Sequence, residues 1–296
     1  MNTIGGYIRL ARPVNMLICG LSVLCGGIIG DRPLTVLTGF IMAFGNDPPQ
    51  LPLRLVAAIV SASLILAAGN VLNDIRDVAS DRINAPHRPL PSGAVTGTGA
   101  AIYCTLLFLG GLVTALPLGF FGTATALTAA LLLAVYDIRL KGVPLAGNLA
   151  VALLGGLAFV YGGIAGECTG RALIPASFAA LFHLGREIIK DAADIRGDSS
   201  SGVRTAATAW GVHTAGRLAA AVFAALAAVV VLPAVTGYFG VVYTVYIALF
   251  VYPIILYAAA SSLGNPGEAT LRRVSTLLKI DMPVGIFAVL AGFQGW

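Results

Sequence analysis

Runs of apolar residues about as long as a membrane-spanning helix constrain this fold more than any other feature of the sequence. Of the 296 residues, 58% are hydrophobic and only 10% are charged, whereas soluble domains carry about 25% charged residues. A segment inside lipid must satisfy its own backbone hydrogen bonds, so runs of this length cross as α-helices. The sequence therefore predicts an all-α polytopic membrane protein with nine transmembrane helices, at about 13–30, 55–73, 99–116, 120–136, 143–165, 172–190, 212–232, 239–260 and 276–294.

One uncharged stretch of the sequence is long enough to form two of these spans. Residues 89–136 hold no charged side chain, but Pro117 and Gly119 favour a turn that makes two spans of them. The apolar segment 33–46 is too short to cross, so we expect it to be interfacial or a loop. The four cysteines lack metal-ligand spacing and are expected to be small buried hydrophobes.

The distribution of basic residues predicts the orientation in the cell membrane. With nine spans, only Arg32, Arg54 and Arg171 of the 18 lysines and arginines lie on one side. The positive-inside rule then places the other side in the cytoplasm. We expect a cytoplasmic amino terminus and an external carboxyl terminus.

Two acidic clusters with matching spacing lie at the ends of apolar runs. Residues 73–81 read NDIRDVASD, and residues 190–198 read KDAADIRGD. On a helix, positions four residues apart form one stripe, so each cluster predicts a stripe of like charges that repel one another. Mg²⁺ suits such a site because it takes oxygen ligands from one or two carboxylates plus substrate phosphates. The predicted ligands of two Mg²⁺ ions and a diphosphate are Asn73, Asp77, Asp81, Asp194 and Asp198, with Asn70, Asp74, Glu187 and Asp191 as supporting partners.

Basic residues near the clusters are candidates to bind phosphate oxygens. Arg88 follows the first cluster, Lys141 lies in a later loop of the same side, and Lys190 is inside the second. The alternative is that these residues only anchor the helices at the headgroup boundary. His87, His183 and His213 have no convincing metal-ligand partner and are expected to be structural. Both acidic clusters lie on the predicted cytoplasmic side, where we expect the active site.

The repeat predicts one domain, 1–296, built from two pseudo-equivalent halves of about 1–141 and 142–296. Each half would bring an acidic helix end to one central cavity. The long polar segments 82–98 and 199–211 are candidates for cytoplasmic helix-loop caps of that cavity.

The acidic clusters resemble the motifs of the UbiA superfamily of intramembrane prenyltransferases. Residues 73–81 match the family's first motif, N-D-x-x-D-x-x-x-D, without gaps, and Asp194 and Asp198 correspond to its second, D-x-x-x-D. Residues 88–93 are similar to the family's continuation of the first motif. The segment 136–141, with Tyr136 and Lys141, is similar to its Tyr…Lys loop. Within the superfamily, 186–198 looks most like archaeal digeranylgeranylglyceryl phosphate synthases.

This resemblance implies transfer of a geranylgeranyl group from geranylgeranyl diphosphate to the free hydroxyl of geranylgeranylglyceryl phosphate. The product carries the second ether bond of archaeal membrane lipids. Mg²⁺ is the implied cofactor, both substrates come from the bilayer, and no nucleic acid is expected as a partner. Tyr136 is expected to orient or stabilise the developing allylic carbocation.

Two alternatives stay open. An aromatic prenyltransferase of quinone biosynthesis, acting on an acceptor such as 4-hydroxybenzoate, would share the acidic motifs. A cation transporter could use the same carboxylates, but transporter sites usually lie near the bilayer midplane. Here both clusters lie at span ends, and only Asp281 is a candidate acid within a span.

Overall fold

The computed structural model describes residues 3–29, 50–200, 202–264 and 266–292, and every regular element in these ranges is a helix. The expected interfacial segment 33–46 lies outside them. The long helices are α2 (Pro13–Ile28), α4 (Gln50–Arg76), α6 (Gly97–Ala115), α7 (Gly119–Val135), α8 (Ala146–Ala165), α9 (Thr169–Ala193), α12 (Val212–Val235), α14 (Tyr252–Leu263) and α15 (Glu268–Gly292). The short elements are α1 (Thr3–Ala11), α5 (Val78–Asn84), η1 (Leu116–Leu118), η2 (Tyr136–Leu140), α10 (Ile195–Ser200), α11 (Ala206–Trp210), α13 (Val241–Tyr246) and η3 (Ile247–Val251).

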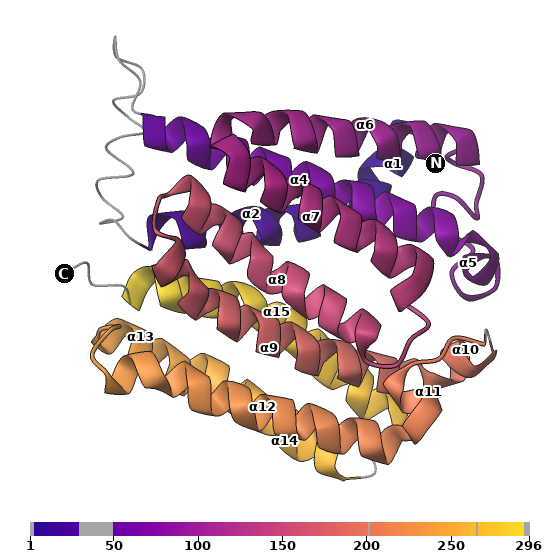
Figure 1. Cartoon of the computed structure of the whole chain (residues 1–296). Helices are drawn as coiled ribbons and strands as arrows, with labels where there is room; N and C mark the ends of the chain where they lie inside the picture. The colour runs from indigo at the N-terminus through magenta and orange to yellow at the C-terminus, as the bar shows by residue number, and fades with distance from the viewer. Residues whose placement is uncertain (1–2, 30–49, 201, 265, 293–296) are drawn as a thin grey trace.

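The long helices lie side by side along one common direction (Figure 1). Neighbours in the bundle are α6 with α4, α4 with α2, α2 with α8, α8 with α9, and α9 with both α12 and α15. The central helices α2, α8, α9 and α15 therefore connect a layer from the first half of the chain to a layer from the second half. Each long helix or helix pair falls on one of the spans expected from the sequence.

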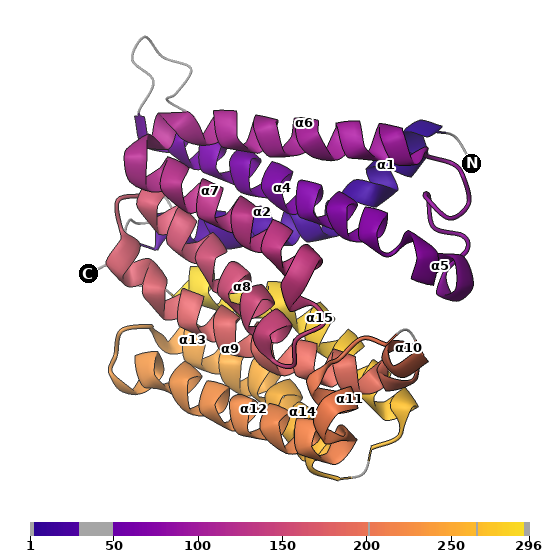
Figure 2. The ribbon, with the colours of Figure 1, turned by 45° about the vertical axis from the view of Figure 1, so that its right-hand side comes forward.

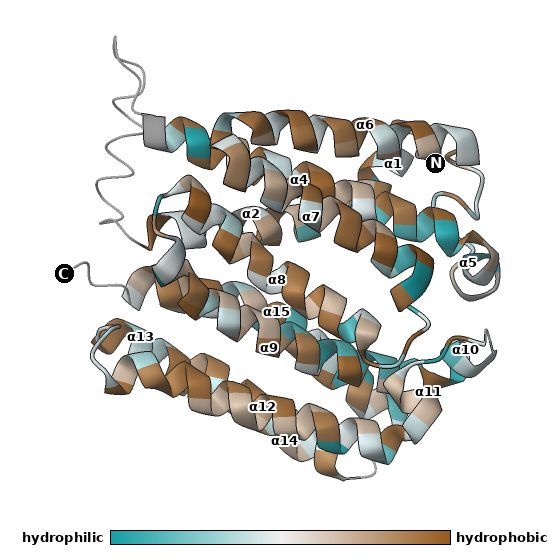
Figure 3. Ribbon diagram, in the orientation of Figure 1, coloured by the Kyte–Doolittle hydropathy of each residue, from teal (hydrophilic) through white to brown (hydrophobic). Residues whose placement is uncertain are grey.

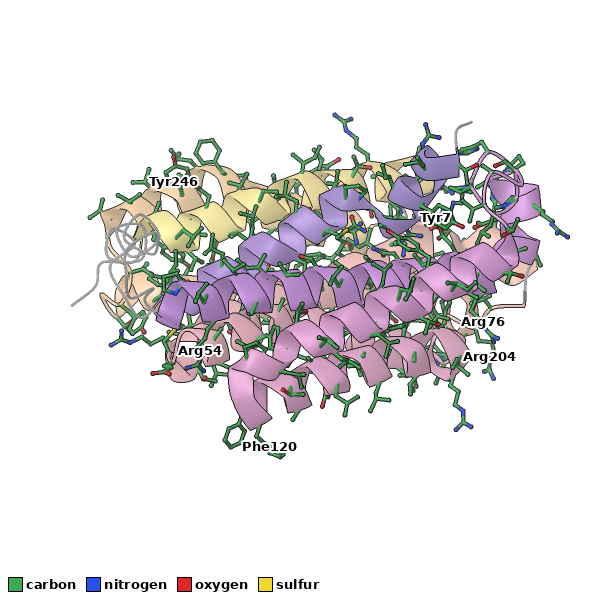
Figure 4. All side chains as sticks on the ribbon, turned by 90° about the horizontal axis from the view of Figure 1, so that it is seen from above. Tyr7, Arg54, Arg76, Phe120, Arg204 and Tyr246 are labelled. Carbon is green, nitrogen blue, oxygen red and sulfur yellow. The ribbon has the colours of Figure 1, made fainter. Side chains whose placement is uncertain are left out.

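The outer surface of the bundle is apolar, as a surface that faces lipid must be. The described residues contain eight helical stretches long and apolar enough to cross a membrane. One stretch, 97–140, is 44 residues long and contains both α6 and α7. The chain turns between these helices at Gly119, whose φ of 74° is readily adopted only by glycine. Just after that turn Phe120 is 80% exposed and points away from the bundle (Figure 4).

Glycines let the central helices approach one another closely. A Cβ at Gly26 of α2 would collide with the backbone carbonyl of Phe159 in α8, and one at Gly162 of α8 would collide with that of Val23 in α2. Small residues at such crossings are the usual means by which helices associate in lipid, where no hydrophobic effect drives them together. This close contact joins α2 and α8, which lie between the motif-bearing helices α4 and α9.

Polar residues gather at one end of the bundle. The short helices α5, α10 and α11 lie at that end in both views of the ribbon (Figures 1 and 2), and the strongly hydrophilic positions are concentrated there (Figure 3). Arg76 and Arg204 lie at this end, whereas Arg54 lies at the opposite one (Figure 4). Both acidic clusters are therefore at the same end of the helices.

Candidate active site at the polar end of the bundle

Each acidic cluster interrupts a long helix at its central aspartate. Asp77 lies between α4 and α5 with φ −88° and ψ 0°, and Asp194 lies between α9 and α10 with φ −101° and ψ 10°. These angles fall in the sparsely populated bridge region, where active-site residues are often found. The prediction of one uninterrupted helical stripe was therefore wrong at its middle position.

The spacing of the clusters nevertheless survives this break. The amide of Asp77 donates to the carbonyl of Asn73 at 2.9 Å, and that of Asp81 donates to the carbonyl of Asp77 at 2.8 Å. In the second cluster, the amide of Asp198 donates in the same way to the carbonyl of Asp194 at 3.0 Å. The repeated motif thus has the same local backbone in both halves.

Cations from separate segments contact the acids of the first cluster. Lys141, just after η2, places its Nζ 2.5 and 2.6 Å from the two carboxylate oxygens of Asp77. Arg88, in the loop after α5, donates from Nη1 to Oδ2 of Asp81 at 2.7 Å. These ion pairs reduce the repulsion between like charges that the sequence predicted. The side chains of both cations are 33–40% exposed. They remain accessible to an anionic substrate.

Hydrogen bonds to other segments also hold the polar residues next to the central aspartate of the first cluster. Asp74 is buried and accepts a hydrogen bond of 2.5 Å from Nη2 of Arg12. The side-chain amide of Asn73 donates to Asp137 at 2.9 Å, which leaves the amide oxygen of Asn73 for a ligand. Asn70 donates to the carbonyl of Ala11 at 3.1 Å. These contacts agree with supporting roles for Asp74 and Asn70.

The second cluster repeats this arrangement with different residues. Arg272 of α15 lies 3.0 Å from Oδ1 of Asp194, at an exposed position. Next to it along α9, half-buried Asp191 accepts a hydrogen bond from the side-chain amide of Asn148 in α8 at 2.7 Å. Glu187 is buried, and accepts from Lys190 at 3.1 Å and from Arg186 at 2.7 Å. Lys190 therefore has an acidic partner on its own helix.

Charges from both halves of the chain act on Asp198. Partial burial raises the pKa of Asp198, and the neighbouring Asp194 carboxylate raises it further, while Lys190 and Lys141 lower it. Lys141 also pairs with Asp77, so one cation contacts the first cluster and acts electrostatically on an acid of the second.

Tyr136 begins the π-helical turn η2, at the same end of the bundle as the clusters. Its hydroxyl is within electrostatic reach of Lys190 and Asp191, which belong to the other half of the chain. A Cβ at Gly147 would come within 3.3 Å of its ring. The backbone of Tyr136 belongs to η2, and its ring packs against the start of α8. Turns of π-helix recur at functional sites.

The donor atoms of the site suit magnesium bound together with a phosphate ligand. The predicted ligands offer carboxylate and amide oxygens only, which Mg²⁺ prefers. Among the described residues no three acids, histidines or cysteines converge into a cage that would hold a metal alone. Mg²⁺ usually keeps several water ligands and shares substrate phosphates with one or two carboxylates. The residues fit a metal that each cluster holds together with a diphosphate.

Some contacts at this site were not predicted from the sequence as part of it. Arg12, Asp137, Asn148 and Arg272 contact Asp74, Asn73, Asp191 and Asp194. The signal for Arg12 is in its backbone, which has φ 55°, a conformation that residues other than glycine adopt mainly where the surroundings demand it. Arg272 lies 78 positions after Asp194, and nothing in their spacing links them. His183 packs its ring where a Cβ of Gly155 would lie, which agrees with a structural role.

Comparison with known proteins agrees with this geometry. The profile of the UbiA prenyltransferase family matches residues 33–278. The digeranylgeranylglyceryl phosphate synthase of Methanoculleus marisnigri is 36% identical over 295 residues, covering 98% of each chain. That of Thermococcus sibiricus is 35% identical over 286 residues, covering 97% of this chain and 96% of the relative.

Solved structures share the fold. A structure described as digeranylgeranylglyceryl phosphate synthase in membranes superposes with a TM-score of 0.77 at 29% identity, covering 99% of both chains. A UbiA homologue from Archaeoglobus fulgidus, bound to GPP and Mg²⁺, gives a TM-score of 0.59 at 19% identity, covering 97% of this chain and 99% of that one. The chain belongs to the UbiA prenyltransferase family. This membership identifies an enzyme of prenyl transfer and excludes the transporter interpretation.

Proposed function

We propose that this enzyme transfers a geranylgeranyl group from geranylgeranyl diphosphate to the free hydroxyl of geranylgeranylglyceryl phosphate. The observation that carries the proposal is that both acidic motifs lie at one end of the bundle, each with an accessible cation on its central aspartate. The full-length similarity to digeranylgeranylglyceryl phosphate synthases supports the choice of both substrates.

In this proposal Asn73, Asp77, Asp81, Asp194 and Asp198 hold two Mg²⁺ ions with the diphosphate of the donor. When bound, Mg²⁺ neutralises the negative charge that develops on the departing diphosphate. Lys141 and Arg88 move from their carboxylate partners to diphosphate oxygens, where Arg88 offers a bidentate fork. Lys190 stays beside Glu187 and presents its charge to the same region.

The reaction breaks the allylic C–O bond of the donor and forms an ether bond to the acceptor oxygen. The hydroxyl proton of the acceptor passes to the released diphosphate or to a nearby carboxylate. Tyr136, within electrostatic reach of Lys190 and Asp191, orients the reacting carbon, while the apolar bundle excludes water from the cationic carbon. Both lipids enter sideways from the bilayer and keep their phosphates at the polar end.

The membrane topology follows from the same arrangement. Because α6 and α7 are separate helices joined by a turn at Gly119, we infer that they cross separately and that the chain crosses nine times. The positive-inside rule then puts the amino terminus and the active site in the cytoplasm, and the carboxyl terminus outside. Two pseudo-equivalent halves, 1–141 and 142–296, each supply one motif to a central cavity. Polar segments around α5 and α11 cap it.

One assay tests the proposed reaction. Purified protein in detergent with Mg²⁺ and labelled geranylgeranyl diphosphate is given geranylgeranylglyceryl phosphate in one reaction and 4-hydroxybenzoate in another. We expect ether product from the lipid acceptor alone. Product from the aromatic acid alone would instead indicate the quinone-forming activity.

A further inference from the structure

An apolar cavity inside the bundle contains one buried carboxyl group that the reaction does not use. The cavity has a volume of about 90 Å³ and lies among α2, α8, α9, α12, α14 and α15. Three phenylalanines line it, together with Asp281 of α15 and His183 of α9. Asp281 is 2% exposed, and neither of its carboxyl oxygens has a hydrogen-bond partner among the described residues.

A buried carboxyl without a hydrogen-bond partner needs an explanation. Buried polar groups in proteins are nearly always hydrogen-bonded, and ionisable groups inside a membrane usually mark a functional site. The cavity is large enough for a few water molecules, which need polar partners of their own. Besides Asp281, His183 offers a ring nitrogen, and Ser22 offers a hydroxyl oxygen while donating its proton to the carbonyl of Ile18 at 3.0 Å. A water molecule shared between Asp281 and these groups would satisfy the carboxyl.

The cavity lies deeper in the bundle than the active site, and helices α9 and α15 contribute residues to both. Arg272 of α15 contacts Asp194 at the mouth, and Asp281 is nine residues further along that helix, about 13 Å deeper. His183 is eleven residues before Asp194 on α9, about 16 Å from it along the axis. Both helices therefore place the cavity about 13–16 Å from the mouth, in the direction in which an apolar chain would run from it into the bundle. Its lining is mostly apolar, as the end of such a chain requires.

We infer that Asp281, with the water it binds, ends the pocket for the prenyl chain and thereby limits the length of donor that the enzyme accepts. This inference rests on the proposed function. A chain that stops in the apolar part of the cavity leaves the hydrated carboxyl undisturbed. A chain with one more isoprene unit must displace that water, and a hydrocarbon cannot replace the lost hydrogen bonds.

Two variants of the full-length enzyme test this role from opposite directions. Asp281→Leu replaces the carboxyl by an apolar side chain of similar size, and Asp281→Asn is its control because it keeps a polar group that binds water. Gly285 also lines the cavity, and a Cβ there would meet nothing within 4 Å, so Gly285→Leu fills the cavity without a backbone collision. The readout is the ratio of kcat/KM between prenyl diphosphates that differ by one isoprene unit. A ratio within one variant does not depend on how much of the preparation is folded.

For Asp281→Leu we expect the preference for the C25 donor over the C20 donor to rise about tenfold, the lower range of what a change in a hydrophobic pocket achieves. Asp281→Asn should keep the wild-type ratio. Gly285→Leu should lower the use of C20 relative to C15 by about tenfold. Either a wild-type C25-to-C20 ratio in Asp281→Leu or a wild-type C20-to-C15 ratio in Gly285→Leu would overturn the inference, and should Asp281→Leu not fold, the Gly285→Leu ratio decides alone. The ratios are measured with the acceptor that supports turnover, so a failure of the proposed acceptor shows separately.

Discussion

Substitutions in the ion pair between Lys141 and Asp77 should affect catalysis much more than stability. The paired atoms are 2.5–2.6 Å apart, and the two side chains are 33% and 26% exposed. Two unit charges at 4 Å attract each other by about 4 kcal/mol at an effective dielectric constant of 20. Water and salt reduce the net contribution of exposed pairs to about 1 kcal/mol or less. As a contribution to stability, the pair is therefore modest.

We predict that Asp77→Asn and Lys141→Met each lower the free energy of unfolding by no more than about 1 kcal/mol. Each should lower kcat/KM for prenyl transfer by about a hundredfold or more, because a charge aimed at the leaving diphosphate is lost. Thermal unfolding in detergent measures the first quantity, and release of labelled ether product measures the second. Glu167→Gln is the matched control, since it breaks an ion pair with Arg54 at the opposite end of the bundle. Its turnover should equal that of the wild type.

The charge-reversed variant, Asp77→Lys with Lys141→Asp, sharpens this test. A pair that only holds the fold together tolerates the exchange, so stability should return toward the wild-type value. Turnover should stay low, because a lysine at position 77 cannot bind a metal ion. Wild-type turnover in the reversed variant would refute the assignment of Asp77 as a metal ligand and Lys141 as a phosphate ligand.

Three further predictions concern other parts of the molecule. Gly162→Leu should lower the free energy of unfolding by about 1–3 kcal/mol or more, since its Cβ would collide with the Val23 carbonyl; an unchanged unfolding temperature would speak against the close crossing of α2 and α8. Burial and Asp194 raise the pKa of Asp198, so protons compete with Mg²⁺ for this carboxylate as the pH falls. When the pH is lowered, the wild type should therefore begin to lose Mg²⁺ affinity at a higher pH than Asp198→Asn, which lacks this titrating group. Identical pH profiles would count against Asp198 as a ligand. Arg272→Ala should lower kcat/KM about tenfold while the protein stays folded, as loss of one charged partner does at metal sites; full activity would limit Arg272 to a surface contact.

The sequence predicts the helices and the motifs of this enzyme well, because both are local properties. Apolar run length fixes where a helix can cross lipid, and Pro117 with Gly119 marks the turn that divides the uncharged run 89–136. Four-residue spacing places Asp77 next to Asp81, and Asp194 next to Asp198. The motif residues therefore follow from the printed order alone.

The partners of those aspartates are properties of the packed bundle. Asn148 contacts Asp191 because α8 packs on α9, and Arg12 contacts Asp74 because a left-handed residue turns α1 into α2. The break of the helix at Asp77 is equally hidden, since its sequence has no glycine or proline. Periodicity cannot predict which side chain from another helix completes a site.

Binding of a donor that cannot react tests the central claim most directly. Isothermal titration with geranylgeranyl thiolodiphosphate measures its Mg²⁺-dependent affinity for the wild type, Asp77→Asn and Asp194→Asn. If one diphosphate is held by both motifs, each substitution should weaken binding by about tenfold or more, and removal of Mg²⁺ should make the three proteins alike. Wild-type affinity in either folded variant, with Mg²⁺ present, would contradict a site shared by the two halves.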